Sequence, residues 1–169
     1  SIFVAQSHLV DGQSMENPLF DRERLMVDKL SYRFIEPKRG EIIVFKYPKN
    51  PKSRFVKRVI GIPGDVIEIR DRVVYVNGVP LDEPYIKAPT YYNMPPVKVL
   101  PNHVFVMGDN RNNSLDSRFA DVGQIPYELI VGRALFSYWP PKAIKWLSVP
   151  KTFAAVEEAV KAQQQDDSV

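Results

Sequence analysis

The sequence contains no cysteine. This absence excludes disulfide bonds, thiolate catalysis and metal sites built from cysteine, and it makes the chain compatible with reducing and oxidising compartments alike. Histidine is scarce as well, with two residues, His8 and His103, in a chain of 169. A reaction that needs a histidine base therefore has only these two candidates.

Long apolar runs and a strong charge imbalance are also missing. No stretch of about 18 apolar residues occurs, so no segment of this sequence is expected to span a bilayer as a helix. The net charge of +3 is too small to indicate a nucleic-acid partner, although it would not oppose an anionic membrane surface. The chain begins at Ser1 without methionine and shows no basic segment before a cleavable apolar stretch, and we expect that an N-terminal segment has been lost.

Proline, by contrast, is abundant: the chain has 15, above the usual frequency of roughly 5%. Their spread argues against long helices and favours strands, turns and loops. The hydrophobic fraction of 44% is ordinary for a globular protein and can form a core. A length of 169 residues suits one domain, or a domain with an additional lobe.

Segments dense in β-branched and aromatic residues are expected to form strands, namely 23–34, 40–48, 53–85, 103–110 and 128–141. Within the third segment, Asn77-Gly78 lies between alternating apolar residues, which is a strong signal for a β-hairpin. Residues 80–100 are rich in proline and tyrosine and have little periodicity. We interpret them as an extended excursion.

The C-terminal segment changes character and reads PKTFAAVEEAVKAQQQDDSV. Its apolar residues Phe153, Val156 and Val160 recur at spacings of three and four. This pattern predicts one amphipathic helix of about three turns, followed by a frayed end.

Ser14 follows the turn-forming residues Asp11-Gly12-Gln13 in the stretch VDGQSMENPL. A serine hydroxyl is a poor nucleophile until a base removes its proton. His8 lies six residues before Ser14, and His103 opens an apolar strand, a position more typical of a strand edge. Neither histidine is favoured as the base.

Lys57 is a stronger candidate because it is embedded in apolar sequence, RFVKRVIGIPGD. A strand that is hydrophobic on both faces is expected to be central in a sheet, so Lys57 or Arg58 must point into apolar surroundings. Burial without a counter-charge lowers the pKa of lysine towards neutral pH, whereas arginine stays protonated. The alternative interpretation is a lysine at a strand end whose amine extends into solvent.

A third polar stretch, MGDNRNNSLDSR, covers residues 107–118 directly after a predicted buried strand. Asn, Asp and Ser side chains bond to nearby backbone, so an ordered, hydrogen-bonded loop is expected here, with a solvated surface loop as the alternative. A calcium-binding loop is disfavoured, because no glycine occupies the sixth position from Asp109 and Arg111 stands in a ligand position.

Ser14-Met15, FVKRVIGIPGD and GDNRNNSLDSR, in this order, resemble the motifs of type I signal peptidases, membrane-anchored serine proteases that remove signal peptides from exported proteins. The resemblance extends from about residue 3 to Pro140, and GEIIVFKYP and VGRALF are similar to further family segments. The beginning of the chain and RERLMVDK look more like the Gram-positive and cyanobacterial branches. Several matching segments in order are far more specific than Ser14-Met15 alone.

The resemblance implies a Ser/Lys dyad with Ser14 as nucleophile and Lys57 as general base. It implies that Ser114 makes a hydrogen bond that orients the lysine amine, and that the backbone N–H of Ser14 contributes to an oxyanion hole. Structural support would come from Asp109 and from an ion pair between Asp116 and Arg118.

The resemblance also implies that an extended substrate binds along sheet edges near Ser14 and that small side chains are preferred at the first and third residues before the cut. Some members carry a hydroxyl where this chain has Gly12, which leaves the second oxyanion donor open. No metal or cofactor is needed. The walls of the substrate pockets would be Val10, Met15, Val44, Phe55 and Val56.

The sequence departs from the family just after the nucleophile. The family usually has Ser-Met-x-Pro-Thr-Leu, whereas this chain has Asn17-Pro18 before Leu19, so proline removes a different N–H. A catalytically impaired relative that binds signal peptides or assists assembly therefore stays open. Two further alternatives are a self-cleaving protein of the phage-repressor type and a β-rich interaction module.

The fold implied is mostly β, an antiparallel β-sheet serine protease fold of the signal-peptidase type. We expect a catalytic lobe from 1–65 and 104–145, an inserted β-hairpin lobe at 66–103, and a C-terminal helix and flexible tail at 146–169.

The expected partners are signal peptides of exported preproteins and the lipid bilayer surface, without nucleic acid; the sequence does not predict an oligomeric state. The catalytic domain would lie outside the cytoplasm, anchored by a missing N-terminal transmembrane helix, or on the lumenal side of the thylakoid in a cyanobacterium. Phe3, Phe20 and Trp139 are candidates for lipid contact, although Trp139 before two prolines is more typical of a core residue or of a cap on the sheet.

Overall fold

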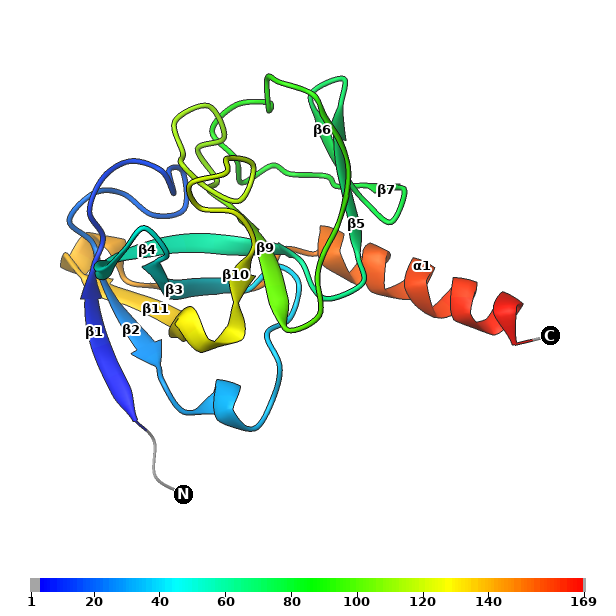
Figure 1. Cartoon of the computed structure of the whole chain (residues 1–169). Coiled ribbons are helices and arrows are strands. Elements are labelled where there is room, and N and C mark those ends of the chain that lie inside the picture. Colours follow the sequence, from blue (N-terminus) through cyan, green and yellow to red (C-terminus); the bar gives the residue numbers. More distant parts are fainter. Residues whose placement is uncertain (1–3, 169) are drawn as a thin grey trace.

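In the computed structural model, which describes residues 4–168, the chain forms two antiparallel sheets and one α-helix (Figure 1). The larger sheet has eight strands, with β12 (Lys145–Trp146) paired to β11 at its side. Its main path runs in the order β1 (Ala5–Leu9), β2 (Arg24–Asp28), β11 (Ile130–Trp139), β3 (Ile42–Tyr47), β4 (Asn50–Gly61), β9 (His103–Met107) and β10 (Ile125–Pro126).

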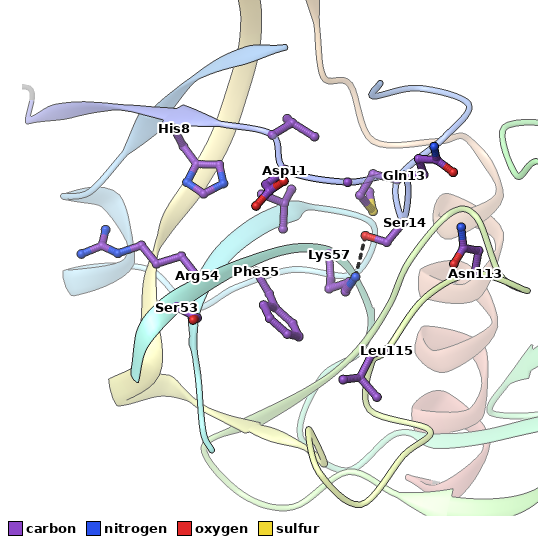
Figure 2. Close-up of a pocket in the computed structure, with 14 residues that line it drawn as sticks. His8, Asp11, Gln13, Ser14, Ser53, Arg54, Phe55, Lys57, Asn113 and Leu115 are labelled. Atoms are coloured by element: carbon purple, nitrogen blue, oxygen red, sulfur yellow. Dashed lines mark hydrogen bonds between the residues drawn. The ribbon is translucent and has the colours of Figure 1, made fainter. Parts of the chain in front are cut away.

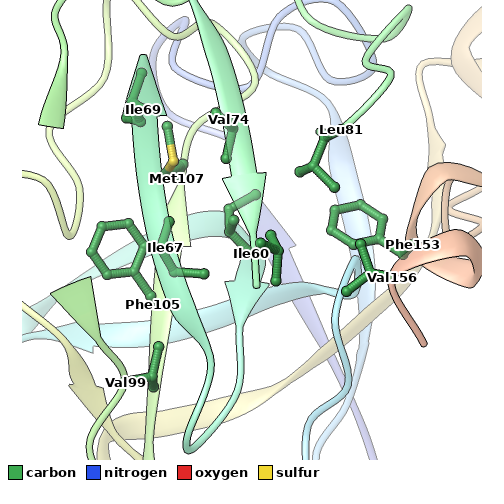
Figure 3. Close-up of a cluster of buried hydrophobic side chains, with 11 residues drawn as sticks. Ile60, Ile67, Ile69, Val74, Leu81, Val99, Phe105, Met107, Phe153 and Val156 are labelled. Carbon is green, nitrogen blue, oxygen red and sulfur yellow. The ribbon is translucent and has the colours of Figure 1, made fainter. Parts of the chain in front are cut away.

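The smaller sheet is built entirely from residues 66–98, a segment inserted between β4 and β9. Its strands lie in the order β7 (Val79–Pro80), β6 (Val73–Val76), β5 (Val66–Arg70) and β8 (Met94–Lys98). Its buried side chains Ile67 and Val74 share a core with Phe105 of the larger sheet and Phe153 of the helix (Figure 3). The two sheets are therefore held together by a common hydrophobic cluster.

Strand β4 lies inside the larger sheet, between β3 and β9, as the hydrophobic character of both of its faces predicted. On one face Val59 packs with Ile43 and Phe45, and on the other Val56 packs with Val44. The sheet thus carries residue 57 into the interior of the molecule.

The predicted strand at 23–34 is only half correct, because β2 ends at Asp28. The carboxylate of Asp28 accepts hydrogen bonds from the backbone N–H groups of Leu30 and Ser31, at 2.9 and 3.1 Å, and these bonds reverse the chain. A 3₁₀ helix, Ser31–Arg33, follows. Two other 3₁₀ helices flank β11, at Tyr127–Leu129 and Pro141–Ala143.

The hairpin predicted at Asn77-Gly78 is confirmed. Both residues have positive φ, 52° and 80°, and they join β6 to β7 with Val76 opposite Val79. The excursion predicted for 80–100 is wrong at its end, where β8 pairs with β5. Because β8 is an edge strand, it tolerates the prolines that made this segment look irregular.

Helix α1 (Thr152–Asp167) is longer than predicted and has no frayed segment before Ser168. Its first turns are anchored by Phe153 and Val156, which are buried in the shared core, and Phe153 lies against Gly40. The remaining residues are mostly strong helix formers, so the helix continues to Asp167 although its side chains are exposed. Among residues 4–168, none of the helices combines the length and the apolar character that crossing a bilayer requires.

Candidate active site

Ser14 lies in the loop that leaves β1, and a tight turn before it sets its position. Gly12 has a φ of +97°, which glycine adopts without strain, and its N–H donates a 2.9 Å hydrogen bond to Asp21 Oδ1. The backbone of Val10 is paired with Glu23, at 2.8 Å, so the start of the loop continues the sheet. Because the Gly12 N–H is already used by Asp21, it does not face the cleft as a free donor.

The loop after β9 holds the other side of Ser14. The Asn110 backbone N–H donates to the Ser14 carbonyl oxygen at 2.9 Å, and Asn110 Nδ2 donates to the Gln13 carbonyl oxygen at 3.0 Å. A Cβ atom at Gly108 would lie 2.5 Å from the same Ser14 oxygen and would also collide with Ser114. The close approach of these two segments therefore requires glycine at position 108.

Lys57 extends from β4 to this loop, and its Nζ donates a 2.6 Å hydrogen bond to Ser14 Oγ (Figure 2). Lys57 is 4% exposed. Burial is the main cause that lowers the pKa of its amine, to about 8, with a smaller contribution from Arg118; Asp116 and Asp109 act in the opposite direction. About one amine in ten is thus neutral at pH 7.

Asp109, which is fully buried, is neutralised by Arg58 rather than by Lys57. Arg58 donates from Nη2 to Asp109 Oδ2 at 2.7 Å and from Nε to Oδ1 at 3.0 Å, and its Nη1 donates to the Gly40 carbonyl oxygen at 2.8 Å. Arg58 and Lys57 point to opposite faces of β4 because successive side chains of a strand alternate. Arg58 therefore pairs with the buried carboxylate of Asp109, and Lys57 forms its hydrogen bond with Ser14.

Asp116 is the second buried carboxylate beside the lysine, and it is also neutralised by an arginine. Arg118 Nε lies 2.8 Å from Asp116 Oδ1, which forms the expected ion pair. Asp116 Oδ2 accepts from the Gly108 N–H at 2.9 Å and from the Ser114 hydroxyl at 2.8 Å. The hydrogen bond expected between Ser114 and Lys57 is not found among the described residues. The Ser114 hydroxyl donates its hydrogen bond to the Asp116 carboxylate instead, which is a stronger acceptor.

Ser14 and Lys57 open into a cleft of about 480 Å³. The cleft lies between two strand edges that have no partner among residues 4–168: the outer edge of β1, and residues 53–57 of β4, beyond the part of β4 that pairs with β9. Five of the residues expected at the substrate site line it, namely Val10, Gly12, Met15, Phe55 and Val56. Val44 does not line the cleft; it lies beneath it in the core, against Val56.

Neither histidine contacts the serine within the described part of the chain. His8 lines the cleft at the end away from Ser14 (Figure 2), and burial together with Arg54 lowers its pKa, so it is neutral at pH 7. His103 begins β9, as predicted, and its Nδ1 lies 2.7 Å from the Pro101 carbonyl oxygen. Lys57 is the basic side chain that reaches Ser14.

The turn after Ser14, where the sequence departs from the family pattern, is held in place by contacts with the inserted segment. Glu16 forms a 2.6 Å ion pair with Lys87, and Asn17 Nδ2 donates to the Ile86 carbonyl oxygen at 3.2 Å. The sequence change at Asn17-Pro18 therefore occurs where the loop contacts residues 86–87, and Ser14 still lies within hydrogen-bond distance of Lys57.

Sequence reasoning missed several residues that build this site. Asn110 and Gly108 belong to the quoted GDN stretch, but their partner, Ser14, lies about a hundred residues away in the chain. Arg111 is fully buried and paired with Glu83 of the inserted segment, which no local pattern indicates. Among residues 4–168, no group of three or more histidine, aspartate or glutamate side chains could hold a metal ion.

Comparison with known proteins agrees with the resemblance noted in the motifs. Residues 1–139 match the family described as signal peptidase, peptidase S26. A probable signal peptidase I-2 from Synechocystis sp. is 42% identical over 165 residues, covering 95% of this chain and 75% of the relative. A signal peptidase I from Leptolyngbya laminosa is 41% identical over 159 residues, covering 89% of this chain and 77% of the relative.

A solved structure is also similar. A crystal structure of a signal peptidase I from Enterococcus faecalis superposes with a TM-score of 0.52 and 32% sequence identity, covering 59% of this chain and 97% of that one.

Proposed function

Because the chain belongs to the signal peptidase family, peptidase S26, we propose that it is a serine endopeptidase that removes signal peptides from exported proteins, with Ser14 as nucleophile and Lys57 as general base. One observation carries this proposal: the amine of a buried lysine with a lowered pKa lies 2.6 Å from the hydroxyl of Ser14. A neutral amine at this distance can accept the hydroxyl proton.

The reaction would proceed through an acyl-enzyme. Neutral Lys57 accepts the Ser14 proton as Oγ attacks the scissile carbonyl carbon, and the backbone N–H of Ser14 stabilises the oxyanion. The lysine ammonium then protonates the leaving amine, the C–N bond breaks and an ester to Ser14 remains. A water molecule, deprotonated by Lys57, hydrolyses this ester.

The surrounding charges would support Lys57 without fixing a proton on it. Asp109 and Asp116 each have an arginine partner, and no carboxylate lies within 4.0 Å of Lys57 Nζ among the described residues. A directly paired carboxylate would raise the pKa of the amine and remove the base. We assign Asp109, Asp116, Arg118 and Ser114 to this support.

Substrate would bind as an extended strand between the free edges of β1 and β4, with backbone pairing on both sides. Val10, Phe55 and Val56 line the same cleft as Ser14. As its walls they would restrict the first and third residues before the cut to small side chains such as alanine. Met15 is 1% exposed and closes the floor.

The direct test is incubation of this chain with a peptide that carries an Ala-x-Ala site. We expect cleavage after the second alanine, and a peptide with phenylalanine at that position should be cut at least about 100-fold more slowly, because a site for small side chains would exclude the ring. Mass spectrometry of the products gives the site. Binding of the peptide without cleavage would instead favour the catalytically impaired relative.

A second prediction, on the pH dependence of kcat/KM, follows from the lowered pKa of Lys57. Only the neutral amine accepts a proton, and lysine becomes neutral as pH rises, so kcat/KM should increase about tenfold per pH unit below pH 8 and level off above it. An initial-rate profile between pH 6 and about 10 measures this midpoint. A midpoint near the ordinary lysine value of 10.5 would contradict Lys57 as a base perturbed by burial.

We further propose that the domain works at the outer surface of a membrane, plasma or thylakoid, to which an N-terminal anchor would attach it. Exposed apolar side chains support lipid contact: Phe20 is 50% exposed and Trp139 52%. The prediction of Trp139 as a core residue is wrong, because its side chain, at the last position of β11, is exposed. Ile144 and Trp146, close to it in sequence, are also exposed. Phe3 lies outside the described residues.

A further inference from the structure

Six cationic side chains surround the end of the cleft that lies away from Ser14. They line two cavities of about 340 and 460 Å³, which meet at Arg54, a residue that also lines the cleft. Asp11 and Glu128 are the acidic residues in the lining of these two cavities. We call this set the basic belt: Arg22, Lys29, Arg33, Lys46, Lys52 and Arg54.

None of the six belt residues forms an ion pair within 4.0 Å among residues 4–168. Some cations elsewhere in the described chain have partners, such as Lys87 with Glu16 and Lys145 with Glu23. Over the whole chain the positive and negative charges nearly balance, with 23 Lys and Arg against 20 Asp and Glu. The belt is therefore a local excess of positive charge that attracts anions from solution.

The position of the belt relates it to the course of the substrate, and this step rests on the proposed function. Figure 2 shows His8 and Arg54 at one side of the cleft and the Ser14–Lys57 pair at the other. Phe55, one of the walls proposed for the residues before the cut, lies between them in the same view. The part of the signal peptide further upstream, which is apolar, therefore leaves the cleft at the belt.

Exposed apolar residues lie next to the same cations. Leu9 lines one of the two cavities and is 39% exposed, and the pairing of β1, β2 and β11 places Leu9, Arg24 and Trp139 in one row across the sheet. Beside the other cavity, Phe34 follows Arg33 directly and is 80% exposed. Cations beside exposed aromatic residues are typical of surfaces that rest on a membrane interface.

We propose that the basic belt binds the phosphate-bearing head groups of an anionic bilayer and so holds the upstream end of the cleft against the membrane. Charge complementarity supports this occupant. The six cations come from three separate segments of the chain, before β2, after β2 and around the β3–β4 hairpin, and they are spread around the cleft. Such a spread matches a planar array of head groups better than a single acidic side chain.

The test compares binding of this chain to phosphatidylcholine vesicles with and without one third phosphatidylglycerol, measured by co-sedimentation. The variant is Lys29→Gln/Lys46→Gln/Lys52→Gln, which avoids Arg54 because that residue lines the cleft. Each lysine near an anionic surface strengthens binding about fivefold, so the variant should bind anionic vesicles about 100-fold more weakly. High salt should remove most of the difference.

A matched control removes three lysines from the opposite region, Lys98→Gln/Lys151→Gln/Lys161→Gln, on β8 and at α1, all exposed. It should lose much less affinity. The proposal is overturned if the two variants lose binding equally, or if the parent chain binds neutral and anionic vesicles alike. Because Lys46 is half-buried, Lys29→Gln/Lys52→Gln serves as a second variant, with about a 25-fold loss expected.

Cleavage of a short water-soluble peptide separates this proposal from the proposed function. The belt variant should cut that peptide as fast as the parent chain. A parent chain that binds anionic vesicles through the belt but cuts no peptide would contradict the peptidase assignment and leave head-group binding intact. If the chain cuts the peptide but binds neutral and anionic vesicles equally well, only the proposal of head-group binding by the basic belt is contradicted.

Discussion

Replacement of Lys57 by methionine or by arginine should abolish peptide cleavage, and Ser14→Ala should do the same. The amine of Lys57 is the basic group that contacts Ser14 Oγ, at 2.6 Å. Loss of a nucleophile or of its base lowers kcat by a factor of about 10⁴ to 10⁶ in serine proteases. Turnover of an Ala-x-Ala peptide, followed by chromatography, measures the effect.

The arginine variant separates basicity from charge. Arginine keeps the positive charge but does not lose its proton near neutral pH, so it cannot act as a base. If Lys57 only supplied positive charge to the site, Lys57→Arg would retain much of the activity, and that result would contradict the mechanism. Ser148→Ala and Lys161→Met, at exposed positions away from the cleft, are the matched controls and should cleave normally.

The second large effect is expected on stability, from Asp109→Ala. Asp109 is 0% exposed, and its carboxylate accepts hydrogen bonds from two nitrogens of Arg58. Arg58 is itself 2% exposed. Removal of one partner of a buried ion pair leaves the other charge uncompensated, at a cost of about 3–5 kcal/mol. The free energy of unfolding in urea should fall by this amount, and kcat should fall too, because Asn110 and its bond to Ser14 are adjacent.

A double variant tests whether the unpaired charge causes the loss. Arg58→Met/Asp109→Leu removes both charges, so it should be more stable than Asp109→Ala alone, although fewer atoms of the wild-type network remain. The pair of Arg70, which is exposed, and Glu68, which is half-buried, gives the comparison: Arg70→Ala should change the unfolding free energy by less than about 1 kcal/mol. Equal losses in Asp109→Ala and in the double variant would show that packing, not charge, determines the effect.

Local patterns predicted the features that depend on neighbouring residues. Apolar residues on both faces of the segment around Lys57 indicated a central strand, and β4 is central. Asn77-Gly78 indicated a hairpin because few residue pairs adopt positive φ, whereas the turn at Asp71-Arg72, with φ of 50° and 66°, was missed because its residues carry no such signal. The end of β2 at Asp28 was missed because a side-chain hydrogen bond, rather than a proline or glycine, terminates it.

Features that join distant segments could not be read from local patterns. The motifs suggested Ser14 and Lys57, but they did not indicate that Asp109 pairs with Arg58 or that Ser114 donates to Asp116 instead of contacting the lysine. Val44 looked like a pocket wall, and only the packing of β3 beneath β4 places it in the core.

The sequence by itself determined the central strand that carries Lys57, the hairpin at Asn77-Gly78, the order of the three motif stretches and the chemical types available for catalysis, because periodicity and residue type act over a few neighbours. Tertiary structure alone decided which carboxylates are neutralised, which unpaired strand edges border the cleft and where unpaired cations gather. These properties depend on distances between residues far apart in the chain. The pKa of the Lys57 amine, for example, depends on its burial and on every charged group near it.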